Sequence, residues 1–528
     1  MQEELTRVDQ LLDRAASSWP ERIAIVDEGN RITFSELHKR SESAANSLRL
    51  LGFTTGARAG ILYTNSIEYV IIFFAVLKAG LVVVPLDTSL TAHGLTGIIS
   101  DCQISLLFTE GRFRRVLPEL LAENSSVTTL VCDTDVRLDK TSVRAMKMES
   151  LYRMTGEPDG NRQAVPASQV FSRDGVLHEL AAIFYTSGST GASKGVMLSH
   201  RNLVSNTLAT GEYLHLTPQD SVLVILPFYY IYGNSLLLTH VAVGGRLILD
   251  NRFMYPEVIL DTLESEQATG FSGVPSNFMI LLNNSTLTSR RLESLRYFTQ
   301  AGGSMAPEVT RTLMTAFPDK QIFIMYGQTE AAPRVTYLPP DQLANKLGSI
   351  GIPVPGVSVT IRDESDSELP AGEVGELTVK GDNVMMGYWN QPEEDRQVLK
   401  DNCLYTGDLA RQDGDGYFYI VGRKKEIIKA GGNRVSAKEI EECLLAHEKI
   451  AEACVIGVAD NILGEAIRAV IVLKAGLAAD AKEIQLYCRR SLADFKVPKQ
   501  IVFLDTLPKY QSGKVNKTQL KEDSICNP

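Results

Sequence analysis

The sequence predicts an α/β fold for its larger part, followed by a smaller α+β unit. Three observations lead to this fold class. Short apolar runs at 59–62 and 81–84 are typical of strands that are covered on both faces. Segments with helical spacing lie between such runs, as they do in layered α/β sheets. After residue 350 the sequence pattern changes to short β-like runs separated by Gly and Asp. A last segment with the pattern helix–strand–strand–helix follows.

The first 150 residues are expected to alternate between helices and strands. Helical spacing covers 5–16, and two short strands at 23–26 and 31–34 form a hairpin around the turn at 27–30. Ser35 is a plausible N-cap for a helix that runs to Leu51, because Glu36 would then stand in its first turn. The Gly-, Pro-, Asp- and Ser-rich segment 155–173 is expected to be a surface loop.

The middle of the chain continues the α/β pattern. Strands are expected at 180–184, 222–226, 246–249 and 322–325, and segments 269–275 and 300–304 end in small residues. An aromatic cluster at 228–233 follows Pro227, and core packing is its simplest explanation. Ligands of open α/β sheets sit outside the carboxyl ends of strands, so Gly residues, hydroxyls and carboxylates at these ends are candidate site residues.

The C-terminal part divides in two. Runs at 357–361, 375–379 and 416–421 indicate a small antiparallel unit. A basic stretch then precedes a helix at 437–446, strands at 450–458 and 466–473, and a helix at 481–492, so we place a domain boundary near Lys425.

Composition narrows the classes of function. The chain has 528 residues, of which 44% are hydrophobic and 22% charged, and this globular composition gives no indication of disorder. Its net charge of −10 argues against a general nucleic-acid binder. Its seven cysteines are scattered without a C-x-x-C pair, which argues against zinc or a disulfide framework and favours a reducing, cytoplasmic compartment. The acidic N-terminus has no hydrophobic signal region, and the most apolar run, 69–86, is interrupted by Lys78, Gly80 and Pro85, so no transmembrane segment is expected.

The stretch Tyr185–Gly195, YTSGSTGASKG, is the strongest functional signal. Three glycines, five Ser or Thr hydroxyls and one lysine follow an apolar strand. Such a loop can turn its N–H groups and hydroxyls toward anionic oxygens, and a lysine adds a full charge, so we predict a phosphate cradle. The spacing differs from the G-x-x-x-x-G-K-[ST] of a Walker A loop. A flexible Gly/Ser linker is the alternative.

Four further stretches carry candidate chemistry. They are Tyr326–Glu330, with a hydroxyl and a carboxylate; Tyr405–Asp408, with an Asp in a turn; 422–439, which is basic with a Gly431–Gly432 pair; and 508–515, with Lys514 in a Gly-bearing loop. Taken singly, each has a simpler explanation, such as a helix cap, a turn former, a solvated face or an exposed tail lysine.

Together, in this order, the five stretches resemble the adenylate-forming ligase superfamily, closest to AMP-forming acyl-CoA synthetases, over nearly the whole chain. The resemblance implies a large N-terminal adenylation domain (1–424) of two doubly wound subdomains plus a small β-barrel. A small mobile α+β C-terminal domain (425–528) follows it. It also implies ATP, Mg²⁺ and coenzyme A as the cofactor and co-substrates.

The resemblance also implies roles for individual residues. Catalytic roles are carried to Lys514, Lys194 and Glu330, and Mg²⁺ binding to Glu330 with Thr186. Asp408 would bind the ribose hydroxyls with Arg423 nearby, Thr329 would contact the α-phosphate, and Lys425 matches the domain hinge. The phosphate-binding residues are Thr186, Ser187, Gly188, Ser189, Thr190, Gly191 and Lys194. The adenine site is carried to Gly302, Gly303, Tyr326 and Gly327, and the pantetheine tunnel to Gly431 and Gly432.

The residues agree with these roles in physical terms. A carboxylic acid is already ionised at neutral pH, so its attack on an anionic phosphate needs charge stabilisation and positioning, not a general base. Two departures from the family pattern are visible: Ser193 stands where Pro is frequent, and Tyr230 stands where the aromatic motif often has the His that is thought to gate the acyl pocket.

The aromatic cluster has no acidic residue to pair with an α-ammonium group, which favours a fatty or other non-amino acyl or aryl acid as substrate. Tyr229, Tyr230, Phe271, Val274 and Gly302 would line its pocket. Coenzyme A is the expected acceptor, with local positive charge for its phosphates from Lys424, Lys429, Arg434 and Lys438. The alternative acceptor is the phosphopantetheine arm of an acyl carrier protein. Alternative functions for the whole chain are a luciferase-type monooxygenase and a non-catalytic binding module. The sequence leaves monomer and homodimer open.

Overall fold

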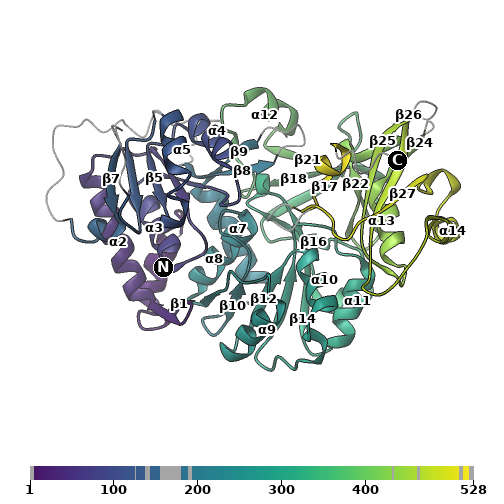
Figure 1. Ribbon diagram of the computed structural model, residues 1–528, viewed down its shortest axis with the longest axis horizontal. Coiled ribbons are helices and arrows are strands. Elements are labelled where there is room, and N and C mark those ends of the chain that lie inside the picture. The colour runs from purple at the N-terminus through teal and green to yellow at the C-terminus, as the bar shows by residue number, and fades with distance from the viewer. Residues whose placement is uncertain are drawn as a thin grey trace.

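The computed structural model describes residues 5–124, 126–136, 143–154, 180–187, 193–430, 433–460, 464–509 and 515–522. Within these residues the chain forms two large sheets covered by helices, a third antiparallel sheet, and a smaller C-terminal unit (Figure 1). This arrangement confirms the predicted fold class. The predicted loop at 155–173 lies outside the described residues.

The first large sheet has the strand order β19-β9-β8-β4-β3-β5-β6-β7 in the described part of the chain. The pairs among β3 to β7 and between β4 and β8 are parallel, whereas β9 runs antiparallel to both β8 and β19. Its strands are β3 (Arg58–Leu62), β4 (Val82–Pro85), β5 (Leu106–Thr109), β6 (Thr129–Cys132), β7 (Arg144–Lys147), β8 (Leu180–Ser187), β9 (Ser193–Ser199) and β19 (Gly387–Tyr388). Helices α3 (Ile67–Lys78), α4 (Ala92–Cys102), α5 (Leu117–Glu123) and α6 (Met148–Leu151) belong to this part.

The second large sheet has the order β16-β15-β14-β13-β12-β10-β11-β1-β2 among the described residues. It is parallel from β1 through β14, with antiparallel strands at both edges. Its strands are β1 (Ile23–Asp27), β2 (Asn30–Thr33), β10 (Ser221–Val224), β11 (Arg246–Leu249), β12 (Gly270–Gly273), β13 (Tyr297–Gln300), β14 (Gln321–Gly327), β15 (Arg334–Leu338) and β16 (Ile352–Pro353).

Helices cover the second sheet on both faces, because its strands alternate between two hydrophobic clusters. Side chains of one parity pack in a cluster with α9 (Pro256–Ser265), α10 (Pro275–Asn284) and α11 (Pro307–Ala316). Side chains of the other parity join the largest cluster, with α1 (Asp9–Ser18), α2 (Phe34–Leu50), α7 (His200–Tyr213) and α8 (Ile231–Val243). Because that cluster also contains residues of the first sheet, α7 and α8 lie between the two sheets (Figure 1).

One predicted helix start is wrong. The strand ends at Thr33 and α2 begins at Phe34, so Thr33, not Ser35, is the N-cap. The Thr33 hydroxyl accepts from the Glu36 backbone N–H at 3.2 Å, and the Glu36 carboxylate accepts from the Thr33 N–H at 3.0 Å. This reciprocal capping box satisfies two backbone donors, and it places Phe34 in the helix, where the side chain is fully buried.

The third sheet consists, in the described chain, of β17 (Val357–Arg362), β18 (Val374–Gly381), β20 (Leu399–Lys400), β21 (Cys403–Gln412) and β22 (Phe418–Arg423), all antiparallel, with α12 (Pro392–Val398) beside it. The last unit contains β23 (Ile427–Ala430), β24 (Asn433–Ser436), β25 (Ile450–Asp460), β26 (Gly464–Leu473), β27 (Gln500–Phe503), α13 (Ala437–Leu445), α14 (Ala481–Ser491) and α15 (Lys517–Glu522). The chain passes from the third sheet to the fourth through the 3-10 turn η6 (Lys424–Glu426).

Candidate active site

The predicted phosphate cradle lies between two paired strands. Thr186 is opposite Lys194 and Ser187 is opposite Ser193 in the antiparallel β8–β9 pair. Gly188, Ser189, Thr190 and Gly191 fall outside the described residues, so the structure describes only where the loop leaves and re-enters the sheet. The returning strand β9 is held on its other side by β19 and by the Trp389 N–H, which donates to the Gly195 carbonyl at 2.7 Å.

Lys194 is largely buried and has a carboxylate partner. Its Nζ lies 2.5 Å from Oε2 of Glu394, in the first turn of α12, and 5.1 Å from the ring centroid of Tyr388. The hydrogen bond and charge of Lys194, and then the charge of Lys425, lower the pKa of Glu394. A phosphate bound by Lys194 would therefore compete with Glu394 for it.

Glu330 lies beside the same tyrosine. It stands in the 3-10 turn η4 (Thr329–Ala331) after β14, and its Oε1 accepts from the Tyr388 hydroxyl at 2.8 Å. Burial raises the pKa of Tyr388, and the charge of Glu330 adds to the rise. Lys194 and Glu330, the predicted charge clamp and metal ligand, are therefore brought together through Tyr388.

The donor set around Glu330 fits Mg²⁺. This ion is usually held by one or two carboxylates, with water and substrate phosphates completing its octahedron. The described residues contain no group of three or more His, Cys, Asp or Glu that could hold a metal alone. A single carboxylate beside a phosphate cradle is therefore the arrangement that Mg²⁺ would need here.

A second cluster forms around Asp408, which is 3% exposed on β21. Its Oδ1 accepts from Nε of Arg423 at 2.8 Å, and its Oδ2 accepts from the Tyr326 hydroxyl at 2.6 Å. The carboxylate raises the pKa of Arg423, whereas burial, followed by the Asp408 charge, raises that of Tyr326. The predicted adenine, ribose and Arg423 positions therefore meet at one carboxylate.

The predicted acid pocket is brought together in part. A Cβ on Gly302, whose φ is +83°, would stand 2.9 Å from the Tyr230 hydroxyl and 3.1 Å from Cγ1 of Val274, so these three residues are neighbours. Gly303 lies against the Pro275 ring. Tyr229 is half-buried, and burial, together with the nearby Asp87, raises its pKa.

Phe271 lies elsewhere. It is fully buried between Phe278 and Phe298, at centroid distances of 5.7 and 6.3 Å, in the cluster on the opposite face of the second sheet from Val274. Successive side chains of a strand point to opposite faces of the sheet, so Phe271 and Ser272 in β12 lie on different faces. Val274, directly after the strand, lies on the same side as Ser272.

The predicted C-terminal site residues are only partly described. Lys514, Gly431 and Gly432 fall outside the described residues, and Lys429 and Arg434 are described as opposite partners in the β23–β24 pair. Lys425 stands in η6. Of the proposed CoA-phosphate residues, Lys424 Nζ lies 3.0 Å from Glu376, and Lys438 Nζ donates to the Ile420 carbonyl at 2.6 Å.

Sequence reasoning missed three residues that contact this region: Tyr388, Glu394 and Arg334. Tyr388 lies in a short aromatic-containing segment (386–390) for which no chemistry was expected, and Glu394 follows that segment. Arg334 begins a mostly apolar strand two residues after Ala332, and a lone charge in such a strand was the available signal.

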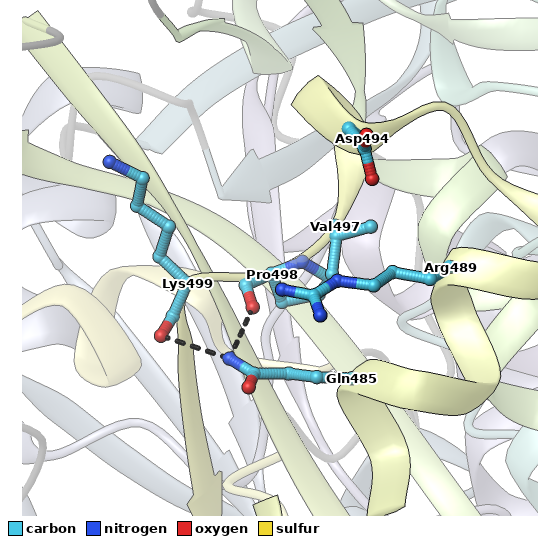
Figure 2. Close-up of a pocket in the computed structure, with 6 residues that line it drawn as sticks. All are labelled: Gln485, Arg489, Asp494, Val497, Pro498 and Lys499. Atoms are coloured by element: carbon cyan, nitrogen blue, oxygen red, sulfur yellow. Dashed lines mark hydrogen bonds between the residues drawn. The ribbon is translucent and has the colours of Figure 1, made fainter. Parts of the chain in front are cut away.

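A pocket in the C-terminal unit contains none of the predicted site residues. Gln485, Arg489, Asp494, Val497, Pro498 and Lys499 line it, and Gln485 Nε2 donates to the Pro498 and Lys499 carbonyls (Figure 2). Separately, none of the helices in the described part of the chain is long and apolar enough to span a membrane.

Comparison with known proteins links both parts of the chain to one kind of enzyme. Residues 12–389 match the family model described as AMP-binding enzyme, and residues 439–514 match the AMP-binding enzyme C-terminal domain. A long-chain-fatty-acid–CoA ligase of Bacillus subtilis is 32% identical over 98% of this chain and 95% of its own length.

Solved structures give the same result. ATP-bound MatB from Rhodopseudomonas palustris superposes with a TM-score of 0.83 at 30% identity, covering 98% of both chains. The o-succinylbenzoate coenzyme A synthetase MenE of Bacillus subtilis, in complex with ATP and a magnesium ion, has a TM-score of 0.81 at 28% identity, covering 97% of this chain and 99% of that one.

Proposed function

Because this chain belongs to the AMP-binding enzyme family, we propose that it is an acid–thiol ligase that uses ATP, Mg²⁺ and coenzyme A. It activates a carboxylic acid without an α-amino group as an acyl-adenylate, with release of pyrophosphate. It then transfers the acyl group to the thiol of coenzyme A, with release of AMP.

One observation carries this proposal most directly. A cation and a carboxylate, Lys194 and Glu330, meet at Tyr388 beside the cradle strands, and a separate buried carboxylate, Asp408, lies at the carboxyl end of the Tyr326 strand. These are the groups that a nucleoside triphosphate with Mg²⁺ requires: positive charge for the phosphates, a metal ligand, and acceptors for the ribose hydroxyls.

In the first half-reaction, an oxygen of the acid carboxylate attacks the α-phosphorus, and the bond from that phosphorus to pyrophosphate breaks. Both reactants are anionic, so the protein's task is to stabilise charge and to align them. Lys194 exchanges Glu394 for the departing phosphates, and Thr329 contacts the α-phosphate. Glu330, with Thr186, would hold Mg²⁺, and the ion would supply further neutralisation of the triphosphate charge. We assign to Lys514 the contact that bridges the acid carboxylate and the α-phosphate.

In the second half-reaction, the thiol sulfur attacks the acyl carbonyl carbon, the bond from that carbon to the AMP oxygen breaks, and the thiol proton goes to solvent. Lys514 is not needed for this step. We propose that residues 425–528 rotate about Lys425 and bring Gly431 and Gly432 to the pantetheine arm, where the absence of side chains permits close approach. The position of Lys425 in η6, where the chain passes between two sheets, supports this hinge.

Free coenzyme A is the acceptor in this proposal. A curated relative that matches nearly the full chain is named as a CoA ligase, which favours coenzyme A over a carrier protein. We place the enzyme in the cytoplasm, because the six cysteines in the described residues are free thiols, as expected in a reducing compartment.

A pyrophosphate-release screen over a panel of carboxylic acids, with and without coenzyme A, tests the function. We expect acid-dependent pyrophosphate release, with steady turnover and AMP formation only when coenzyme A is present. Turnover that required a carrier protein instead of coenzyme A would contradict the acceptor assignment, and no release with any acid would contradict the ligase itself.

A further inference from the structure

Arg334 is a buried cation without an acidic partner among the described residues. It is 1% exposed at the start of β15, and within the described residues none of its three side-chain nitrogens has a hydrogen-bond acceptor. Its described neighbours are aromatic: the guanidinium carbon lies 4.1 Å from the ring centroid of Tyr232. A cation–π contact offsets only part of the free-energy cost of burying an unpaired charge. Arg334 therefore destabilises the fold unless something else binds it.

The backbone of Arg334 is fixed. Its N–H donates to Oδ1 of Asn206 at 3.1 Å, and its carbonyl accepts from Nδ2 of Asn206 at 2.7 Å and of Asn383 at 3.1 Å. In the β14–β15 pair, Arg334 is the partner of Gly327 in the Tyr326–Glu330 motif. The guanidinium is thus held at a set position next to the motif that is proposed to contact the adenylate.

Arg334 sits in a polar layer between α8 and the second sheet. The Tyr232 hydroxyl lies 2.9 Å from Oγ1 of Thr299, which lies 2.7 Å from Oγ of Ser272. Burial raises the pKa of Tyr232, and the charge of Arg334 is the largest opposing influence. The Tyr232 hydroxyl also interacts with Arg334, but a guanidinium carries five N–H donors, so this one oxygen leaves most of them unused.

This layer continues the acid pocket. Tyr230 is the N-cap of α8 and Tyr232 stands in the first turn of that helix, whereas Ser272 lies in β12 and Val274 directly follows that strand. Val274 and Tyr232 belong to the same hydrophobic cluster, on the α8 side of the sheet, whereas Phe271 lies on the other side. An acid whose carboxylate reaches the adenylate site past Tyr230 and Val274 would direct its far end toward Arg334.

We propose that Arg334 determines substrate specificity by binding a second carboxylate, so that the acid activated by this chain is a dicarboxylic acid. The assignment rests on the proposed ligase function. A planar guanidinium with unused N–H groups matches a carboxylate in a bidentate contact, and burial makes this charge-assisted contact strong. An apolar tail would leave the guanidinium desolvated and unpaired, so a monocarboxylic acid of the same length is rejected.

Matched pairs of monocarboxylic and dicarboxylic acids of equal carbon number test the proposal, with coenzyme A-dependent AMP formation as the readout. We expect the wild-type enzyme to prefer the dicarboxylic member of the best pair by about 100-fold or more in kcat/KM. Arg334→Met should remove most of this preference by lowering kcat/KM for the diacid and raising it for the monoacid. Arg334→Lys keeps the positive charge but loses the planar guanidinium, so its preference for the diacid should lie between those of the wild-type enzyme and Arg334→Met.

Arg468→Met is the matched control. Arg468 is also buried, at 5% exposure, but it lies on β26 with its Nε donating to Gln500 at 2.7 Å. It should leave the acid preference unchanged. A wild-type enzyme that uses monoacids as well as diacids, or an Arg334→Met enzyme that keeps the diacid preference, would overturn the assignment. No AMP formation with any acid would instead overturn the ligase function on which it rests.

Thermal unfolding of the ligand-free enzyme separates a functional from a structural role and remains informative if the methionine variant is inactive. Because Arg334→Met replaces an unpaired buried charge by an apolar side chain of similar length, the Tm should stay equal or rise. A diacid should raise the Tm of the wild-type enzyme and not that of the variant. A Tm that falls sharply in Arg334→Met would show that the arginine serves the fold and would overturn the proposal.

Discussion

Two arginines of this chain, Arg423 and Arg334, differ in both solvent exposure and charge pairing. Arg423 has a side chain that is 53% exposed, yet it is paired at 2.8 Å with the Asp408 carboxylate. Arg334 is 1% exposed, yet none of its side-chain nitrogens has an acceptor in the described residues. Stability alone would favour the reverse, because water can solvate the exposed cation and cannot reach the buried one.

The difference separates the two halves of the proposed site. On the nucleotide side, cations already have partners, Arg423 with Asp408 and Lys194 with Glu394, and a ligand exchanges one set of contacts for another. On the proposed acid side, Arg334 has no hydrogen-bond acceptor for its side-chain nitrogens among the described residues. The nucleotide is the same in every turnover of the family's reaction, whereas the acid is what must be selected.

The largest effect is expected for a third cation, Lys514, which is neither of these two arginines. Lys514→Ala should lower the rate of acyl-adenylate formation by about 1,000-fold, the loss expected when a transition-state charge contact is removed. It should spare thioester formation from supplied acyl-adenylate, because that step needs no contact to the α-phosphate. Single-turnover assays of the two half-reactions measure this, and equal loss in both would contradict the assignment.

The paired arginine can be tested through its carboxylate. Asp408→Ala should raise the KM for ATP by about 100-fold, because the ribose loses a charged acceptor and Arg423 loses its partner. The preference among acids should not change. Glu257→Ala, which removes a carboxylate partner of Arg290 at 2.8 Å on α9, is the control and should leave the KM for ATP near the wild-type value. An altered acid preference in Asp408→Ala would contradict the division of the site into a nucleotide half and an acid half.

A smaller effect is expected from the pair at the cradle. Glu394→Gln removes the carboxylate that competes for Lys194, so the KM for ATP should fall by a few-fold, the effect of a partly exposed ion pair. Steady-state kinetics at varied ATP measures it. A KM that rises instead would indicate that Glu394 positions Lys194 and does not compete with the phosphate.

The same pair predicts a small pH dependence of stability. The pKa of Glu394 in the folded state is lowered, chiefly by its hydrogen bond to Lys194, so the pair stabilises the fold at neutral pH and this contribution is lost as the pH falls through that pKa. The wild-type Tm should therefore exceed that of Glu394→Gln near pH 7, and the gap should close in acid. A gap that widens as the pH falls would contradict the ion pair.

The sequence was enough to predict that the residues of the proposed nucleotide half are neighbours. Asp408, Tyr326 and Arg423 stand in motifs whose order is distinctive, and the structure brings them together. The acid half was harder, because its residues are separated along the chain and Arg334 belongs to none of the motifs. Arg334 is a single basic residue before an apolar run, and only the burial of its side chain under α8 distinguishes it from a surface arginine.

The fold was predicted to a similar extent. The continuous apolar run at 81–84 predicted strand β4, whose four residues are all buried between parallel neighbours. A short run without polar residues is typical of a strand covered on both faces. The start of α2 was misplaced by two residues, since Thr33 and Ser35 are both capable caps and only the reciprocal bonds with Glu36 decide between them. Phe271 was assigned to the acid pocket because its neighbours in sequence are there, although strand alternation sends it to the opposite face.

The most direct test of the two-sided account is one kinetic comparison of Asp408→Ala and Arg334→Met on the same pair of acids. For each enzyme, kcat/KM is measured for ATP and for the matched diacid and monoacid. The account predicts that Asp408→Ala loses efficiency with ATP and keeps the wild-type ratio between the two acids, whereas Arg334→Met keeps the KM for ATP and loses that ratio. Two variants that change both quantities together would contradict it.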